Sequence, residues 1–344
     1  MKRFQRIILL ATGLFSFATA VSAQSDLVRN VSNKGTVAAA FLEVGVNARA
    51  EAMGGAYTAM RGNPDMMYWN PSGIAFLRTT AVSVSHTQWL AETEFNYASV
   101  AVPLAGTRFV LGGSFTTLGI PEQPVRSYDG SLTGEMYDAR DYAAGLSVGL
   151  LIIPEFAFGA TVKYINQRIW SERATGLGFD FGVTYQTPLN GLTMGSSISN
   201  FGGDLQMDGK NLVDIIDPDP NNQGVTDIPV RYITNSYPLP QIFRFGLAYE
   251  RTFGDFSSVS AVDLMHPTGS TESMNLGLEL GFKDFFFIRS GYQNLFEKDQ
   301  INGLTLGLGI QYMLDSRQRF AFDYAFSEWG MLGSAHRISM SIQL

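Results

Sequence analysis

Cysteine is absent from this 344-residue chain, and charged side chains are scarce, at 16%. A soluble domain normally carries about a quarter charged residues. Without cysteine the chain forms no disulfide and offers no thiolate to a structural zinc site. Hydrophobic residues make up 45% of the sequence, and 36 glycines accompany them. This composition is atypical of a soluble enzyme and favours a chain with apolar surroundings.

Long hydrophobic runs are missing too, except at the N-terminus. A membrane-spanning helix needs about twenty consecutive apolar residues, and the longest apolar stretch covers only residues 7–21. Low charge without spanning helices fits a closed β-barrel. A barrel satisfies its backbone hydrogen bonds internally and shows the lipid only alternate side chains.

The N-terminus has the three parts of an export signal. Three basic residues lie among the first six, an apolar centre covers residues 7–20, and Val21-Ser22-Ala23 offers a small-residue cleavage site. We therefore predict a signal peptide over residues 1–23; the alternative, an anchor helix, is too short to span a membrane comfortably. Cleavage removes three positive charges and shifts the formal net charge from −7 to −10. An acidic chain with scattered cations does not indicate nucleic-acid binding, which needs a concentrated basic patch.

From about residue 79 onward, apolar residues alternate with small or polar ones. The clearest run is Leu177, Phe179, Phe181, Val183 and Tyr185, and residues 274–282, 304–312 and 320–326 repeat it. Successive side chains of a strand point to opposite faces. Each segment therefore has one apolar face and one face of glycine, hydroxyl and amide side chains with isolated acids.

A soluble β-sandwich also alternates, but the segments here are long enough to cross a bilayer at a tilt. Aromatics near strand ends, such as Trp89, Tyr185, Tyr249 and Tyr312, fit an interfacial belt. We predict an all-β fold: a transmembrane antiparallel barrel over residues 79–344, in contact with the lipids of a bacterial outer membrane. The fourteen expected strands are 79–90, 94–103, 107–118, 140–153, 155–170, 175–187, 191–200, 239–251, 256–265, 271–282, 283–293, 302–314, 317–327 and 333–344.

Two segments do not follow the alternation. Residues 24–78 hold small-residue clusters and turn-forming motifs; we predict a hatch or plug that folds into the barrel, the alternative being a periplasmic lead-in. Residues 201–238 are too polar and too rich in proline for a strand. They are expected to form a long outer loop, and loops of this length are usually functional or mobile.

Two stretches carry a resemblance to a known family. They are Ala48-Arg49-Ala50-Glu51-Ala52-Met53-Gly54-Gly55-Ala56-Tyr57-Thr58-Ala59 and Tyr68-Trp69-Asn70-Pro71-Ser72-Gly73-Ile74-Ala75. Further matches are Ile198-Ser199-Asn200-Phe201-Gly202, Met207-Asp208-Gly209, Tyr237-Pro238-Leu239-Pro240 and the ending His336-Arg337-Ile338-Ser339-Met340-Ser341-Ile342. With these motifs the chain resembles the PorV/PorQ family, a branch of the fourteen-stranded FadL-like outer-membrane barrels.

The resemblance implies an N-terminal hatch inside the barrel and two candidate functions. Its motif residues are Met53, Gly54, Gly55, Trp69, Asn70 and Pro71. One function is protein interaction within a type IX-like secretion and surface-attachment machinery, in which the barrel docks on a large translocon barrel and receives secreted cargo proteins. The other is a FadL-like channel for hydrophobic small molecules. The sequence leaves both open.

Residue patterns for catalysis or metal binding are weak. The three histidines stand alone, and His336 near Ser339 or Ser341 is explained by the abundance of serine, so we predict no catalytic residue, no cofactor and no enzyme activity. Asp217, Asp219 and Asn221 have the opening spacing of a calcium loop but lack its closing glutamate, which leaves a weak calcium candidate beside the simpler reading of a solvated acidic loop.

Charged residues on the predicted lumen face are a further candidate feature. They are Asp180, Asp263, Glu279, Asp323, Arg244 and Arg289. Because buried charges need partners or water, they either form ion pairs that hold a plug to the wall or line a selectivity filter.

Overall fold

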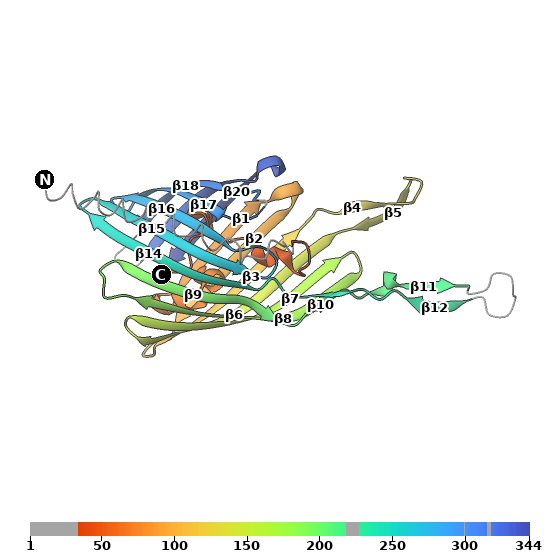
Figure 1. The fold of residues 1–344 in the computed structure, drawn as a ribbon, viewed down its shortest axis with the longest axis horizontal. Coiled ribbons are helices and arrows are strands. Elements are labelled where there is room, and N and C mark those ends of the chain that lie inside the picture. The colour runs from red at the N-terminus through yellow and green to blue at the C-terminus, as the bar shows by residue number, and fades with distance from the viewer. Residues whose placement is uncertain (1–33, 218–226, 299, 315–317) are drawn as a thin grey trace, which may run out of the picture. The chain divides into compact units, whose positions relative to one another are not determined.

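Fourteen antiparallel strands close into one barrel, in which the first strand pairs with the last (Figure 1). The computed structural model describes residues 34–217, 227–298, 300–314 and 318–344, so the predicted signal peptide lies outside the described residues. The barrel strands, in order, are β1 (Ala81–Gln88), β2 (Glu94–Pro103), β3 (Phe109–Gly119), β6 (Ala139–Ile153), β7 (Phe156–Ile169), β8 (Glu172–Gln186), β9 (Leu192–Gly202), β14 (Ile242–Phe253), β15 (Phe256–Pro267), β16 (Ser273–Phe282), β17 (Phe286–Leu295), β18 (Leu304–Met313), β19 (Arg319–Glu328) and β20 (Ser334–Gln343).

The all-β prediction and the strand number are confirmed, and the strand ends lie within a few residues of those expected. Side-chain exposure follows the alternation of the sequence. On β8 the apolar Leu177 and Phe181 are 52% and 42% exposed, whereas Asp180 between them is 1% exposed. Apolar side chains thus cover the outside of the barrel, as a surface that meets lipid requires. Within the described residues, no helix is both long and apolar enough to span a bilayer.

The two ends of the barrel differ in the length of their connections. At one end, which we call the short-turn end, consecutive strands are joined by short connections, for example residues 104–108, 154–155 and 254–255. At the other, the long-loop end, β3 continues into the hairpin of β4 (Gln123–Arg126) and β5 (Leu132–Tyr137).

The predicted irregular loop at 201–238 is partly wrong. It contains two short strand pairs, namely β10 (Leu205–Gln206) with β13 (Ser236–Tyr237) and β11 (Val213–Ile216) with β12 (Ile228–Arg231). The β-branched Val213, Ile215 and Ile228 favour a strand. These strand-forming runs are short, and the polar, proline-rich centre between them does not continue their pattern. Residues 218–226 of that centre lie outside the described residues.

Residues 34–77, which we call the inner segment, lie inside the barrel. They form η2 (Ala40–Glu43), α2 (Ala48–Ala52), α3 (Met66–Trp69) and η3 (Pro71–Phe76). Helix α2 contacts β17 to β20, and η3 contacts β3 and β6 to β8, so the segment reaches opposite sides of the wall. Met53 and Ile74 are fully buried, which places the main hydrophobic core between the inner segment and the lumen face.

Glycines on the lumen face let the backbone of the inner segment approach the strands. On nine strands a glycine lies so close that an added Cβ would fall within 3.0 Å of an inner-segment atom. These residues, the lumen glycines, are Gly112, Gly149, Gly159, Gly182, Gly195, Gly246, Gly277, Gly291 and Gly307. The glycines that alternate with apolar residues in the sequence therefore form the surface on which the inner segment packs.

Replacing a lumen glycine should displace the inner segment without preventing barrel closure. In Gly291→Val the new Cβ would lie 2.1 Å from the backbone nitrogen of Gly54, and overpacking of this kind costs about 1–3 kcal/mol or more. We expect a higher single-channel conductance in planar bilayers than for the wild type. Gly113→Val is the control because its Cβ meets only Val100, at 3.8 Å. Equal conductance of both variants and the wild type would contradict the packing described here.

Candidate functional site

The six motif residues build the inner segment and attach it to the wall. Gly54 and Gly55 have φ angles of +65° and +69°, a region that suits glycine, and a Cβ on Gly54 would lie 2.6 Å from the carbonyl oxygen of Leu276. The fully buried Met53 packs beside them against Gly277.

Asn70 is the most extensively bonded motif residue. Its Oδ1 accepts hydrogen bonds from the backbone N–H of Ser72 (3.2 Å) and from the Ser72 hydroxyl (2.6 Å), while its Nδ2 donates to the carbonyl oxygens of Thr58 and Val183 at 2.9 and 3.0 Å. Trp69 donates from Nε1 to the Val46 carbonyl at 3.3 Å, and Pro71 begins η3. The motif therefore fixes turns and joins the inner segment to β8.

Ion pairs join α2 to the neighbouring strands of the wall. Arg49 donates to both carboxylate oxygens of Glu279 on β16, at 2.7 and 2.8 Å, and Arg289 on β17 bridges Glu279 and Asp323 at 2.5 and 2.7 Å. Arg337 on β20 pairs with Glu51 at 2.9 Å. Of the two alternatives for the lumen charges, these contacts favour the one in which ion pairs hold the plug to the wall.

Two buried carboxylates hold the inner segment through neutral donors. Asp65 accepts from the hydroxyls of Ser83 (2.9 Å) and Ser99 (2.8 Å) and from Asn47. Asp263 accepts from the backbone N–H of Thr58 at 2.9 Å and from its hydroxyl at 2.6 Å. Burial raises the pKa of Asp65 to about 6, and the hydrogen bonds from the serines and Asn47 limit that rise.

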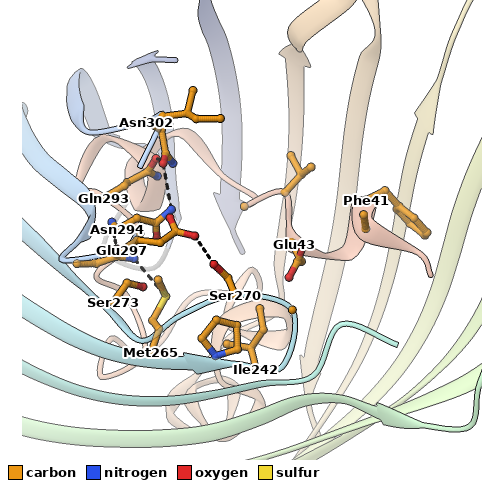
Figure 2. A pocket seen from close by; sticks show the side chains of 18 of the residues that line it. Phe41, Glu43, Ile242, Met265, Ser270, Ser273, Gln293, Asn294, Glu297 and Asn302 are labelled. Carbon is orange, nitrogen blue, oxygen red and sulfur yellow. Dashed lines mark hydrogen bonds between the residues drawn. The ribbon is translucent and has the colours of Figure 1, made fainter. Parts of the chain in front are cut away.

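A cavity of about 530 Å³, the outer pocket, lies between the inner segment and the wall at the long-loop end. Its lining is mostly apolar and includes Val37, Phe41, Val44, Tyr68, Trp69, Trp89, Leu118, Ile242, Met265, Ile301 and Trp329. Figure 2 shows Phe41 and Glu43 across this space from Ile242 and Met265. The volume is within the range usual for small-molecule sites.

Two tryptophans from adjacent connections meet at the outer pocket. Trp89 precedes η4 (Leu90–Glu92) between β1 and β2, and Trp329 precedes η6 (Gly330–Leu332) between β19 and β20. Their rings pack edge to face, with centroids 4.9 Å apart. The prediction that Trp89 belongs to an interfacial belt is therefore wrong, whereas Tyr185, Tyr249 and Tyr312 are exposed on the outer face.

Five charged residues line the outer pocket, namely Lys34, Glu43, Glu51, Arg244 and Glu297. Arg244 on β14 is 3% exposed, donates from Nη1 to the Ser199 hydroxyl at 3.0 Å, and lies over the rings of Tyr68 and Trp69 at 5.9 and 5.7 Å. Glu43, in η2, lines the same cavity and is an exposed residue. Burial raises the pKa of Glu43, and the positive charge of Arg244 offsets part of this rise.

A second cavity lies at the short-turn end. It is polar, measures about 830 Å³, and is lined by Arg61, the β8–β9 turn and the end of β14.

The residues considered for catalysis and metal binding are not brought together. His336 is exposed on the outer face and lies 2.7 Å from the Tyr324 hydroxyl, whereas Ser339 is buried on the lumen face. Asp219 and Asn221 lie outside the described residues, so the calcium site at Asp217 stays a prediction. In the part of the chain that the structure describes, no three His, Cys, Asp or Glu side chains form a group that could hold a metal ion.

The outer pocket itself was not predicted from the sequence. Arg244 was recognised as a lumen charge, but its neighbours Tyr68 and Trp69 come from the inner segment and Ser199 from another strand. The sequence feature that could have indicated the pocket is the pair Trp89 and Trp329, which lie near the first and last strands. These residues become neighbours only when the barrel closes.

Comparison with known proteins defines the fold. No family model and no curated protein sequence matches the chain. Among solved structures, the toluene transporter TbuX of Ralstonia pickettii aligns over 87% of this chain and 97% of its own, at 12% identity and a TM-score of 0.53. The P. putida toluene transporter TodX aligns over 87% and 96% (12% identity, TM-score 0.53), and the CymD monoaromatic hydrocarbon channel over 87% and 96% (14%, 0.53).

These likenesses show the fold: the chain is a closed fourteen-stranded antiparallel barrel similar to those of these transporters. They support that part of the resemblance seen in the sequence. They do not bear on the PorV/PorQ branch, which stays a prediction.

The pKa of Asp65 leads to a test of how the inner segment is held. In the folded protein the Asp65 carboxyl has a pKa of about 6 and loses its proton near that pH, whereas an exposed carboxyl loses its proton near pH 4. Between these values the folded state binds more protons, so the stability contribution of Asp65 falls as pH rises through this window and is constant above it.

We expect Asp65→Asn to reduce the loss of stability between pH 4.5 and pH 7, measured as the urea midpoint for unfolding of the purified barrel. Asp204→Asn, at an exposed position, is the control and should keep the wild-type pH dependence. If Asp65→Asn also keeps it, Asp65 does not titrate in this window.

Proposed function

We propose that this protein spans a bacterial outer membrane, binds hydrophobic small molecules in the outer pocket, and lets them pass when the inner segment, acting as a hatch, moves. One observation carries the proposal: a mostly apolar cavity of about 530 Å³ at the long-loop end, closed below by the inner segment. A cavity of this kind at the mouth of a barrel is a typical ligand site.

The energetics of the outer pocket suit an apolar ligand. Removing apolar surface from water contributes about 25 cal/mol per Å², and Leu118, Met265 and Ile301 offer such surface. The edge-to-face pair of Trp89 and Trp329 adds aromatic faces on which a ring or an alkyl chain packs well.

The structural relatives agree with this proposal. TbuX and TodX are described as toluene transporters and CymD as a monoaromatic hydrocarbon channel. At 12–14% sequence identity, the ligands of these proteins cannot be assigned to this chain by homology. They support the class of function because the same barrel type carries an apolar pocket here.

A second candidate function is protein interaction, the type IX-like role that the resemblance implies. The observation in its favour is exposed apolar surface on the two hairpins of the long-loop end. Leu132 of β5 and Ile215 of β11 are each 64% exposed, and Ile233 after β12 is 90% exposed. Large apolar side chains exposed outside the lipid-facing wall are typical of interaction surfaces.

Binding of ω-bromoundecanol tests the proposed function. Its bromine quenches tryptophan fluorescence, and three of the four tryptophans line the outer pocket. We expect saturable quenching in lipid nanodiscs, weakened about tenfold in Phe41→Ala because the variant loses buried apolar contact. Phe201→Ala is the matched control, since Phe201 is exposed on the outer face. Quenching that never saturates, or that is equal in both variants, would overturn the proposal.

Purification of the tagged protein from its native membrane tests the second function. We expect the wild type to retain a large translocon barrel or secreted cargo, and the double variant Ile215→Ser, Ile233→Ser to lose most of it because the apolar contact surface is removed. Tyr128→Ser, in the β4–β5 hairpin, shows whether that hairpin contributes. Recovery of the wild-type barrel alone would exclude stable docking.

A further inference from the structure

Three arginines form a row across adjacent strands at the long-loop end, which we call the arginine row. Arg140 of β6 is the register partner of Arg168 of β7, and Arg168 is in turn the partner of Arg173 of β8. The three strands lie next to one another in the barrel (Figure 1). Direct partners in an antiparallel sheet point to the same face, with their Cβ atoms about 5 Å apart. Three positive side chains therefore project side by side from the wall.

The alternation of β8 places the arginine row on the outer face of the barrel. Arg173 shares its face with Leu177 and Phe181, which are exposed, whereas Asp180 on the other face is buried. Arg140 and Arg173 are exposed as well. The row is therefore separate from the lumen and from the outer pocket.

Aromatic rings on the same face accompany the arginine row. Phe115 of β3, Tyr142 of β6 and Tyr164 of β7 follow one another with ring centroids 6.1 and 6.2 Å apart. Tyr142 lies two residues from Arg140, towards the middle of the strand. Aromatic rings favour the level of the lipid head groups, and the longer connections of bacterial barrels are extracellular. In this orientation the arginines lie at the head groups of the outer leaflet.

The chain supplies little negative charge to the arginine row. Arg168 pairs with Asp138. Among the described residues, Arg140 and Arg173 have no acid partner and no side-chain hydrogen bond. Like charges directly opposite on neighbouring strands are destabilising. An anion from outside the chain would relieve this repulsion.

The other acids near the arginine row have different partners. Asp208 forms a backbone bridge with Arg173, but its carboxylate pairs with Arg231 of β12. Glu172 accepts a hydrogen bond from the backbone N–H of Asn211 at 3.0 Å. Phosphate suits the free guanidinium groups because its oxygens match the planar fork of donors on arginine.

We propose that the arginine row binds the phosphate of a lipid in the outer leaflet, with the acyl chains of that lipid packed against the aromatic rings beside the row. Arg140 and Arg173 donate hydrogen bonds to the phosphate, while Arg168 stays paired with Asp138 and holds the row together. The inference rests on the part of the proposed function that places the barrel in an outer membrane. It does not involve the ligand of the outer pocket.

Native mass spectrometry of the purified barrel in a neutral detergent tests this site. The two probes are lipid A, a phosphorylated glycolipid, and the same lipid after chemical removal of its phosphates. We expect the wild type to bind lipid A at least about tenfold more tightly than the dephosphorylated form, because hydrogen bonds between charged groups contribute at least that factor. The double variant Arg140→Gln, Arg173→Gln should remove this preference by weakening lipid A alone. Arg140→Lys, Arg173→Lys keeps the charge and should retain most of the preference.

The matched control is Arg108→Gln, Arg251→Gln, which removes two positive charges from exposed positions at the short-turn end and should bind both probes like the wild type. Equal binding of both probes by the wild type, or an equal loss of lipid A in the control, overturns the lipid site. Displacement of lipid A by an equal concentration of inorganic phosphate also overturns it, because the row would then bind a free anion. Saturable quenching by ω-bromoundecanol does not depend on these arginines, so failure of the lipid site leaves the outer pocket's proposed ligand class intact.

Discussion

Close contact between the backbone of the inner segment and a lumen wall of glycines is the constraint on which the rest of the structure depends. A barrel of fourteen strands encloses more space than its own side chains fill, and here a chain segment fills it. A side chain at Gly159 or Gly291 would collide with the backbone of the inner segment. Because the nine glycines lie on nine of the fourteen strands, the segment packs against most of the wall, and the outer pocket lies between the segment and the strands at the long-loop end.

The polar contacts follow from this packing. Backbone and charges that enter a lumen lose water, so each needs a partner from the wall. Glu279 with Arg49, and Asp263 with Thr58, provide such partners. Arg244 is the exception, and it faces the outer pocket rather than a carboxylate.

The barrel was predictable because its signal is local. Alternation such as that of Leu177, Phe179 and Phe181 specifies a strand with one lipid-facing side, and fourteen such segments specify closure. The glycines between them were visible in the sequence, but their role was not, since it depends on which backbone lies opposite. The outer pocket was hidden for the same reason: Trp89 and Trp329 are neighbours only because β1 pairs with β20. The strands β11 and β12 were missed because their short β-branched runs flank a proline-rich centre.

Crystals of the protein with ω-bromoundecanol give the most direct test of the ligand site, because bromine can be located by its anomalous scattering. The proposed function predicts one strong bromine peak inside the outer pocket, which Trp89 and Trp329 line. Bromine peaks only on the lipid-facing outside of the barrel, with the pocket unchanged, would contradict it.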